Sequence, residues 1–226
     1  MIRFKHVSKM YPPNIVGVQG VSLHVKPGEF VSIVGKSGTG KSTLAKLLFA
    51  EERPTRGMIE IGGWDITHIH DRDIPLLRRQ IGVVFQDFKL LPKKTVYENV
   101  AFALQVAGER SHRIREVVPK VLEIVNLGNK LDRYPHQLSG GEQQRVAIGR
   151  ALVHSPKILI ADEPTGNLDT LNSREILDLL SKINEFGTTI ALVTHDREMV
   201  NRIRRRVITL EDGKIVSDVE EGRYRL

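Results

Sequence analysis

The chain has 226 residues, of which 40% are hydrophobic and 27% charged, a balance typical of a folded globular protein. It contains no cysteine, which excludes disulfide bonds and cysteine-ligated metal sites, and no apolar run approaches the ~20 residues that span a bilayer. The first residues, Met1 to His6, lack the pattern of a signal peptide. We therefore expect a cytoplasmic protein, folded as one large domain over residues 1–226.

The net charge of +7 leaves two interpretations open. A basic surface can bind nucleic acid or an anionic membrane, and runs such as Arg202 to Arg206 favour that view. A basic excess is also common on an ordinary solvated face. Because no zinc-finger spacing or aromatic RNA-binding motif accompanies the charge, we expect no specific nucleic-acid partner.

The first 26 residues show the alternation of antiparallel strands. Apolar and polar side chains alternate from Ile2 to His6 and again from Val21 to Lys26, with turn residues at 12–14 and 26–29. Tyr11 stands just before the first turn, where its ring could stack on a nucleotide base. A packing role is the simpler local interpretation of a lone tyrosine.

A glycine-rich segment, Gly35 to Ser42, matches the phosphate-binding pattern G-x-x-x-x-G-K-[ST]. A short β-type run precedes it and residues 43–49 have helical apolar spacing, so a bound phosphate would lie at a helix N-terminus. Lys41 would reach the β- and γ-phosphates, and the Ser42 hydroxyl would hold Mg²⁺. The expected ATP contacts here are Gly35, Lys36, Ser37, Gly38, Thr39, Gly40, Lys41, Ser42 and Thr43.

Three later apolar strands end in polar residues that suit catalysis. The strand at 81–85 is followed by Gln86, the strand at 157–163 ends in Asp162 and Glu163, and the strand at 189–194 is followed by His195. Ligands of α/β sheets bind at the carboxyl ends of strands. Asp162 can hold Mg²⁺, Glu163 can deprotonate an attacking water, and Gln86 and His195 can reach the metal, the water or the γ-phosphate. Taken alone, Gln86 and His195 could equally be ordinary loop residues.

Residues 95–154 change character, because helical periodicity runs from 96 to 106 and from 114 to 127 with little strand signal. Pro119 would start a helix or kink a longer one. Ser139 is a plausible N-cap with Glu142 as its capping-box partner, and Gly140 and Gly141 leave backbone N–H groups open at the start of a helix over 142–153. This second anion site could also be only a well-capped helix. Further expected elements are a helix over 172–185 and a closing hairpin over 207–219.

Taken in order, these motifs resemble those of the ATP-binding cassette (ABC) family across essentially the whole chain. The resemblance implies a P-loop NTPase fold of the α/β class, with a RecA-like core (1–86 and 156–226), an antiparallel β subdomain and an inserted α-helical signature subdomain (87–155). It implies these roles: Tyr11 as the adenine-stacking aromatic, Gly35 to Ser42 as Walker A, Gln86 as the Q-loop, Leu138 to Glu142 as the signature, Ile158 to Glu163 as Walker B, Asn167 to Asp169 as the D-loop and His195 as the switch histidine.

The same resemblance implies an ATPase that uses ATP and Mg²⁺. ATP would join two copies head to tail, with Ser139, Gly140, Gly141, Glu142 and Asp169 of one copy near the nucleotide of the other. Segments 1–4, 73–82, 85–87 and 95–101 are most similar to the cell-division members of the family. These imply an integral membrane partner of the FtsX type, the division machinery, and a peripheral position on the cytoplasmic face of the membrane at the division site. There the ATPase would regulate cell-wall hydrolysis.

Other interpretations remain. Lipoprotein-releasing and macrolide-export ATPases of the family share the segment Pro164 to Asp169. Chromosome-organising relatives separate the two Walker motifs by a long coiled coil, whereas Ser42 and Asp162 lie 120 positions apart (162 − 42) without a heptad insert. Translation-type members carry two cassettes, and this chain has one. A scaffold that binds ATP without turnover is the remaining class.

Overall fold

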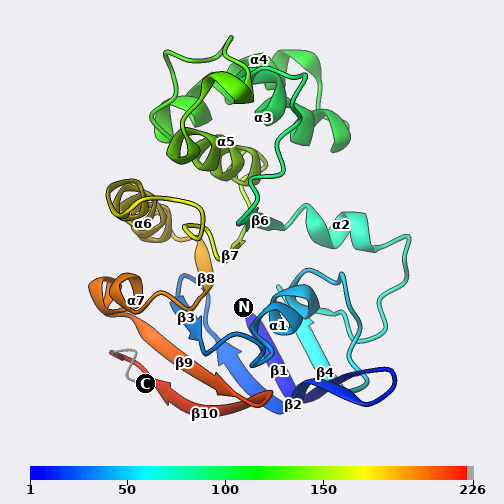
Figure 1. Cartoon of the computed structure of the whole chain (residues 1–226). Helices are drawn as coiled ribbons and strands as arrows, with labels where there is room; N and C mark the ends of the chain where they lie inside the picture. The colour runs from blue at the N-terminus through cyan, green and yellow to red at the C-terminus, as the bar shows by residue number, and fades with distance from the viewer. Residues whose placement is uncertain (223–226) are drawn as a thin grey trace.

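The computed structural model describes residues 1–222, which form two β-sheets and a lobe of helices (Figure 1). Residues 223–226, the end of the expected core segment, lie outside the described residues. The smaller sheet is antiparallel and has the order β2-β1-β4-β5. Its strands are β1 (Ile2–Tyr11), β2 (Ile15–Val25), β4 (Arg56–Ile61) and β5 (Trp64–Asp65).

The larger sheet has six strands in the order β10-β9-β3-β8-β7-β6. Neighbours are parallel from β9 to β6, and β10 is antiparallel to β9 at the edge. The strands are β3 (Phe30–Val34), β6 (Ile81–Phe85), β7 (Ile158–Asp162), β8 (Thr189–Thr194), β9 (Arg206–Glu211) and β10 (Lys214–Val219).

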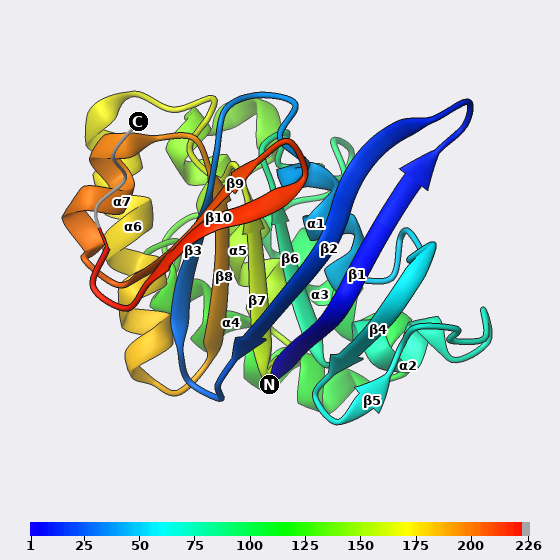
Figure 2. The same ribbon diagram turned by 90° about the horizontal axis from the view of Figure 1, so that it is seen from below.

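Both faces of the larger sheet are buried, which explains its nearly continuous apolar strands. In β7, Ile158 and Ile160 pack into one core with the small sheet, while Leu159 and Ala161 pack into a second core with the helices. Helix α1 (Lys41–Leu48) is buried in the first core, between the two sheets, as Figure 2 shows from below. The phosphate-loop segment therefore joins a central strand directly to a buried helix.

The helical lobe is built from α3 (Val96–Val106), α4 (Ser111–Ile124), the 3₁₀ helix η1 (Pro135–Gln137) and α5 (Gly140–Leu152). Helices α6 (Thr170–Glu185) and α7 (Arg197–Ile203) pack against each other beside the sheet. Helix α2 (Ile74–Arg78) contacts β6 and lies on the opposite side of the molecule from α6 and α7 (Figure 1). In residues 1–222, no helix is both long and apolar enough to cross a membrane.

Several expected boundaries are confirmed and others are corrected. The structure confirms the helix at 96–106, the strand at 189–194 and the closing hairpin. It places Pro119 inside α4 rather than at its first turn. The expected helices at 142–153 and 172–185 begin at Gly140 and Thr170, because the residues that cap them, Ser139 and Asp169, stand immediately before.

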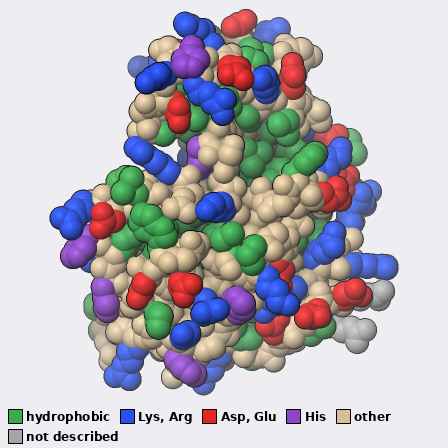
Figure 3. Space-filling view, turned by 180° about the vertical axis from the view of Figure 1, so that it is seen from behind, with side chains coloured by type: hydrophobic (Ala, Val, Ile, Leu, Met, Phe, Trp, Pro, Cys, Tyr) green, Lys and Arg blue, Asp and Glu red, His purple; other side chains and the backbone are tan. Residues whose placement is uncertain are grey.

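The surface charges are mixed rather than gathered. Figure 3 shows Lys and Arg side chains scattered among Asp and Glu over the back of the molecule, with a narrowing where the helical lobe meets the body. On this face the Lys and Arg side chains form no continuous basic stripe, as is typical of a solvated surface.

Candidate functional site

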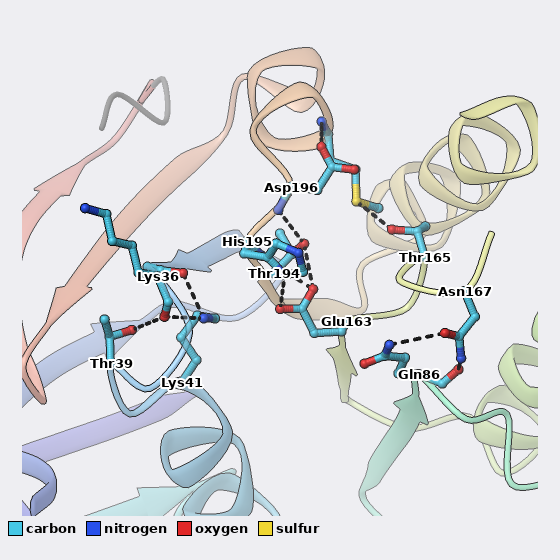
Figure 4. A network of polar contacts seen from close by, with 12 residues as sticks. Lys36, Thr39, Lys41, Gln86, Glu163, Thr165, Asn167, Thr194, His195 and Asp196 are labelled. Carbon is cyan, nitrogen blue, oxygen red and sulfur yellow. Dashed lines mark hydrogen bonds and ion pairs between the residues drawn. The ribbon is translucent and has the colours of Figure 1, made fainter. Parts of the chain in front are cut away.

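Four neighbouring parallel strands end at one edge of the large sheet and place the candidate residues there. In the order β3, β8, β7, β6, the residues after the strand ends are Gly35, His195, Glu163 and Gln86. The register fixes this alignment, since Val34 pairs with Thr194 and Asp162 pairs with both Val193 and Phe85. Residues far apart in the chain are thus brought together, as predicted from the strand ends (Figure 4).

The phosphate-loop segment is closed around its own lysine. Lys41 Nζ donates to the carbonyl oxygens of Gly35 and Lys36, both at 2.8 Å. Burial lowers the pKa of Lys41, and the nearby carboxylates Glu163 and Asp162 act in the opposite direction. The ammonium group is therefore partly desolvated, and its two carbonyl partners carry no negative charge. An anion that enters the loop would supply that charge.

Glycine is required at position 40 by both conformation and space. Gly40 has a φ of 99°, and a Cβ there would lie 2.1 Å from the carbonyl oxygen of Gly17 on β2. Gly38 also has a positive φ of 82°, but a Cβ there would meet no atom within 4 Å. The tight approach at Gly40 holds the loop against the small sheet.

Glu163 and His195 form the closest polar pair at the edge of the sheet. Oε1 of Glu163 lies 2.7 Å from Nδ1 of His195, and Oε2 accepts a hydrogen bond of 3.1 Å from the Thr194 hydroxyl (Figure 4). Glu163 has a φ of 47°, a left-handed conformation that costs a non-glycine residue about 1–3 kcal/mol. Its N–H donates to Val193 O at 2.8 Å, so the backbone of the neighbouring strand holds the residue in place.

Asp162 carries an orphaned buried oxygen. Oδ1 of this carboxylate is buried and has no hydrogen-bond partner among residues 1–222. Burial, and next the charge of Glu163, raise the pKa of Asp162, while Lys41 opposes the shift. A divalent cation would supply the missing partner, so the position fits a Mg²⁺ ligand. In the described part of the chain, no group of three or more His, Asp or Glu side chains could enclose a metal, so further ligands would have to come from hydroxyls, amides, water or phosphate oxygens.

Gln86 is held by a reciprocal pair of hydrogen bonds with Asn167. Gln86 Nε2 donates to Asn167 Oδ1 at 3.3 Å, and Asn167 Nδ2 donates to the Gln86 carbonyl at 3.1 Å (Figure 4). The Gln86 side chain lies against Gly166, where a Cβ would be 2.8 Å from Nε2. The segments expected to be the Q-loop and the D-loop are therefore in direct contact within one chain.

A cleft of about 580 Å³ joins most of the predicted site residues. It extends from Tyr11 and Gly17 on the small sheet past the phosphate loop to the polar residues at the strand ends. Tyr11 forms one side, and its hydroxyl is 3.5 Å from Thr43 Oγ1. Gly35, Lys36, Thr39 and Asp162 do not line it. The predicted residues in its walls are Tyr11, Ser37, Gly38, Gly40, Lys41, Ser42, Thr43, Gln86, Glu163 and His195.

The predicted signature residues lie outside this cleft. Ser139 caps α5 as expected, accepting from Glu142 N, while Glu142 accepts from Ser139 N and also pairs with Lys130. Asp169 caps α6 through Asn172, whose backbone N–H and side-chain amide hold the pKa of Asp169 below its usual value. The second anion site predicted from the sequence is thus formed as a helix start, but apart from the first.

The family model described as "ABC transporter" matches residues 18–166. The chain belongs to the ABC transporter family. It is 52% identical over 224 residues to the cell division ATP-binding protein FtsE of Bacillus subtilis (strain 168), covering 99% of this chain and 98% of the relative. It is 49% identical over 215 residues to FtsE of Escherichia coli (strain K12), covering 95% and 97%.

Solved structures of the same family superpose on the whole chain. A dimeric bacterial ABC transporter cassette matches with a TM-score of 0.88 and 38% identity, covering 99% of this chain and 100% of that one. A dimeric post-hydrolysis cassette bound to ADP and phosphate matches with a TM-score of 0.87, 36% identity and the same coverage. The fold expected from the sequence, a P-loop NTPase of the α/β class, is confirmed, and this ABC protein binds and hydrolyses ATP.

The structure adds three contacts that the sequence patterns did not predict. The Thr194 hydroxyl contacts Glu163, the Asn167 amide contacts Gln86, and the Arg150 guanidinium reaches the segment after Gln86. The position of Thr194 directly before His195 was a usable signal. The other two contacts join residues 61 to 81 positions apart, and local pattern does not reveal them.

Proposed function

We propose that this ABC ATPase forms a head-to-tail homodimer on ATP and drives a conformational change in an integral membrane partner of the FtsX type during bacterial cell division. Its relatives in Bacillus subtilis and Escherichia coli are cell division ATP-binding proteins, which supports the cell-division role. The observation that carries the dimer is the separation of the two anion cradles. Walker A lines the cleft, whereas Ser139 to Glu142 lies outside it. A second copy would bring its signature to the first copy's nucleotide.

In the proposed site, each side chain has one task. Tyr11 stacks on the base, Lys41 leaves its own loop carbonyls to contact the phosphates, and Ser42, Gln86 and Asp162 hold Mg²⁺. The metal, when bound, neutralises charge on the phosphate oxygens. The other expected ATP contacts of the loop, Gly35 to Thr43, act through backbone N–H groups and hydroxyls.

Glu163 is the proposed general base. Its carboxylate takes a proton from the attacking water, while Thr194 and His195 keep it oriented. The Ser139 to Gly141 helix start of the second copy stabilises negative charge on the γ-phosphate. Once that phosphate leaves, the two copies lose the charge that joins them, and the dimer opens.

We propose that residues 87–105 contribute to the surface that binds the membrane partner. This segment runs from the Gln86 end of the cleft through most of α3, and Phe102 on α3 is 43% exposed, so it offers an apolar ring to a partner. The substitution Phe102→Asp should weaken partner binding and leave the ATPase activity of the isolated chain unchanged. If Phe102→Asp binds the partner as well as the unchanged chain does, Phe102 is not part of the binding surface.

The function is tested by measuring ATP hydrolysis with and without the partner. We expect the chain purified in complex with an FtsX-type membrane protein to hydrolyse ATP faster than the chain alone, with no response to lipoproteins or macrolides. A rate that rises with either compound would instead assign the chain to a lipoprotein-releasing or macrolide-export transporter. Equal rates in all preparations would contradict partner-driven hydrolysis.

A further inference from the structure

Arg150 joins the signature helix to the segment that follows Gln86. It lies near the end of α5, the helix that begins after Ser139. One guanidinium nitrogen donates to the carbonyl oxygen of Lys89 at 2.6 Å and the other to that of Phe88 at 2.9 Å. These two bonds connect the end of α5 to the segment that follows β6, across 61 and 62 positions of sequence.

The two carbonyls belong to residues in an unfavourable conformation. Phe88 and Lys89 have φ values of 54° and 48°, and neither is glycine. Two consecutive left-handed residues of this kind persist only where surrounding contacts hold them. The forked guanidinium, which donates to both carbonyls at once, is such a contact.

Arg150 is bound by neutral groups rather than by a carboxylate. Burial lowers the pKa of its guanidinium, and both of its hydrogen bonds go to neutral carbonyl oxygens. Neutral carbonyl oxygens only partly repay the desolvation of a buried cation. Since an exposed or paired arginine would serve stability better, the arrangement points to a geometric role.

The segment 86–89 also contacts the rest of the site. Its first residue, Gln86, lines the nucleotide cleft and is bound to Asn167. The Phe88 ring lies beside the other end of α5, since a Cβ on Gly140 would be 3.9 Å from its Cζ. The segment therefore contacts the start of α5 through a ring and its end through Arg150.

From this geometry we propose that Arg150 is a positioning residue that makes the segment 86–89 and α5 move together. A shift of the Gln86 amide towards a bound nucleotide is then carried to the signature residues Ser139 to Gly141 of the same chain. This inference rests on the proposed dimer, in which that signature serves the nucleotide of the second copy. Nucleotide binding at the phosphate loop of one copy would thereby position that copy's signature residues for the nucleotide of the other copy.

The first test measures this coupling in the monomer by amide hydrogen exchange with mass spectrometry. In the Glu163→Gln chain, at protein concentrations too low for dimers, ATP should change the exchange of residues 86–90 and also of residues 138–142. In Glu163→Gln with Arg150→Met, ATP should still change exchange at 86–90 but no longer at 138–142. Equal responses at 138–142 with and without Arg150 would overturn the proposal.

The second test measures ATP-dependent dimerisation by analytical ultracentrifugation. Arg150→Met in the Glu163→Gln chain should weaken the dimer about tenfold, a usual size for coupling between sites, while the monomer's affinity for ATP stays the same. Arg150→Lys keeps the charge but not the fork, so we expect an intermediate loss. It also provides the test if Arg150→Met does not fold.

The matched control is Ile148→Ala, which removes a fully buried side chain from the same helix without touching the carbonyls of Phe88 and Lys89. It should lower the melting temperature and leave both ATP responses intact. If Ile148→Ala uncouples the sites as Arg150→Met does, Arg150 acts only through stability and the inference fails. If the Glu163→Gln chain never dimerises with ATP, the proposed dimer is wrong. The exchange experiment still tests the role of Arg150, because it is made on monomers and compares the 138–142 response of Glu163→Gln with and without Arg150→Met.

Discussion

Nδ1 of His195 lies 2.7 Å from Oε1 of Glu163, and the Thr194 hydroxyl lies 3.1 Å from Oε2 of the same carboxylate. Two consecutive residues at the end of β8 thus hold both oxygens of a carboxylate at the end of β7. The side chain of Glu163 is 18% exposed and that of His195 is 66% exposed, so the pair has a buried base and an open histidine. This asymmetry motivates the first two predictions.

Glu163→Gln should abolish ATP hydrolysis but keep ATP binding, because the amide has the same shape but cannot accept a proton from water. The unhydrolysed ATP should then trap a dimer. Size-exclusion chromatography with light scattering, with and without ATP, checks this. A Glu163→Gln chain that stays monomeric with ATP, both alone and with its membrane partner, contradicts the closure model.

His195→Ala should lower kcat by roughly 10²–10⁴-fold, the usual loss when a group that assists proton transfer is removed. The KM for ATP should change little, because Lys41 and the loop backbone supply most of the phosphate contacts. His195→Gln, which retains a polar side chain, serves as the control and should recover part of the rate. A loss confined to KM would mean that His195 binds substrate rather than orienting Glu163.

Asp162→Asn should stop Mg²⁺-dependent hydrolysis and at the same time stabilise the nucleotide-free fold at neutral pH. Burial raises the folded-state pKa of Asp162 above its usual 3.8. The folded state then holds the proton more tightly, so this group's contribution to stability is full below the unfolded pKa and falls as pH rises through the folded pKa. Asparagine cannot ionise, so the Asp162→Asn chain should not lose this contribution to stability as the pH rises.

Urea unfolding at pH 4 and pH 7 measures this effect. We expect Asp162→Asn to gain about 1–3 kcal/mol at pH 7, the range for relieving an unsatisfied buried group, and less at pH 4. Asp71→Asn is the control, since the Asp71 side chain is 89% exposed. A destabilised Asp162→Asn at pH 7 would show that the carboxylate has a partner in solution that stabilises its charge.

Gly40→Ala and Gly38→Ala form a matched pair in the phosphate loop. Both residues have positive φ, so each substitution should cost roughly 1–2 kcal/mol for the left-handed conformation alone. At Gly40 the new Cβ also collides with the Gly17 carbonyl, so we expect a further loss and no ATP binding. Thermal unfolding and nucleotide titration of both variants check the ranking. Equal losses would mean that β2 can move away from the loop.

Much of this fold was predictable because its strongest elements follow local rules. The apolar runs of β7 and β8, the periodicity of α3 and the capping box at Ser139 are all written in short stretches of sequence. The strand-end rule also predicted which polar residues would meet. Their identities needed no contact information, only the fact that parallel strands end at one edge.

What the sequence did not predict is short or non-local. β5 has two residues, too few for any alternation, and α7 has seven, so its cap at Asp196 was the only usable signal. β4 begins at Arg56 and runs through Gly57, a residue that weakens a strand, because pairing with β1 holds it there. The contacts of Arg150 and Asn167 join residues 62 and 81 positions apart, which local pattern does not encode.

The register of β7 against β8 also sets which of two adjacent carboxylates does which work. Asp162 is the last residue in the ladder, opposite Val193, and Glu163 is the first beyond it. Asp162 lies in the strand and Glu163 turns out of it in a left-handed conformation, so a slip of one position would change the surroundings of both acids. The backbone hydrogen bonds between these strands therefore determine which acid is the metal ligand and which is the base in the proposed site. Mutations deep in the sheet that shift this ladder should damage catalysis without changing any residue of the cleft.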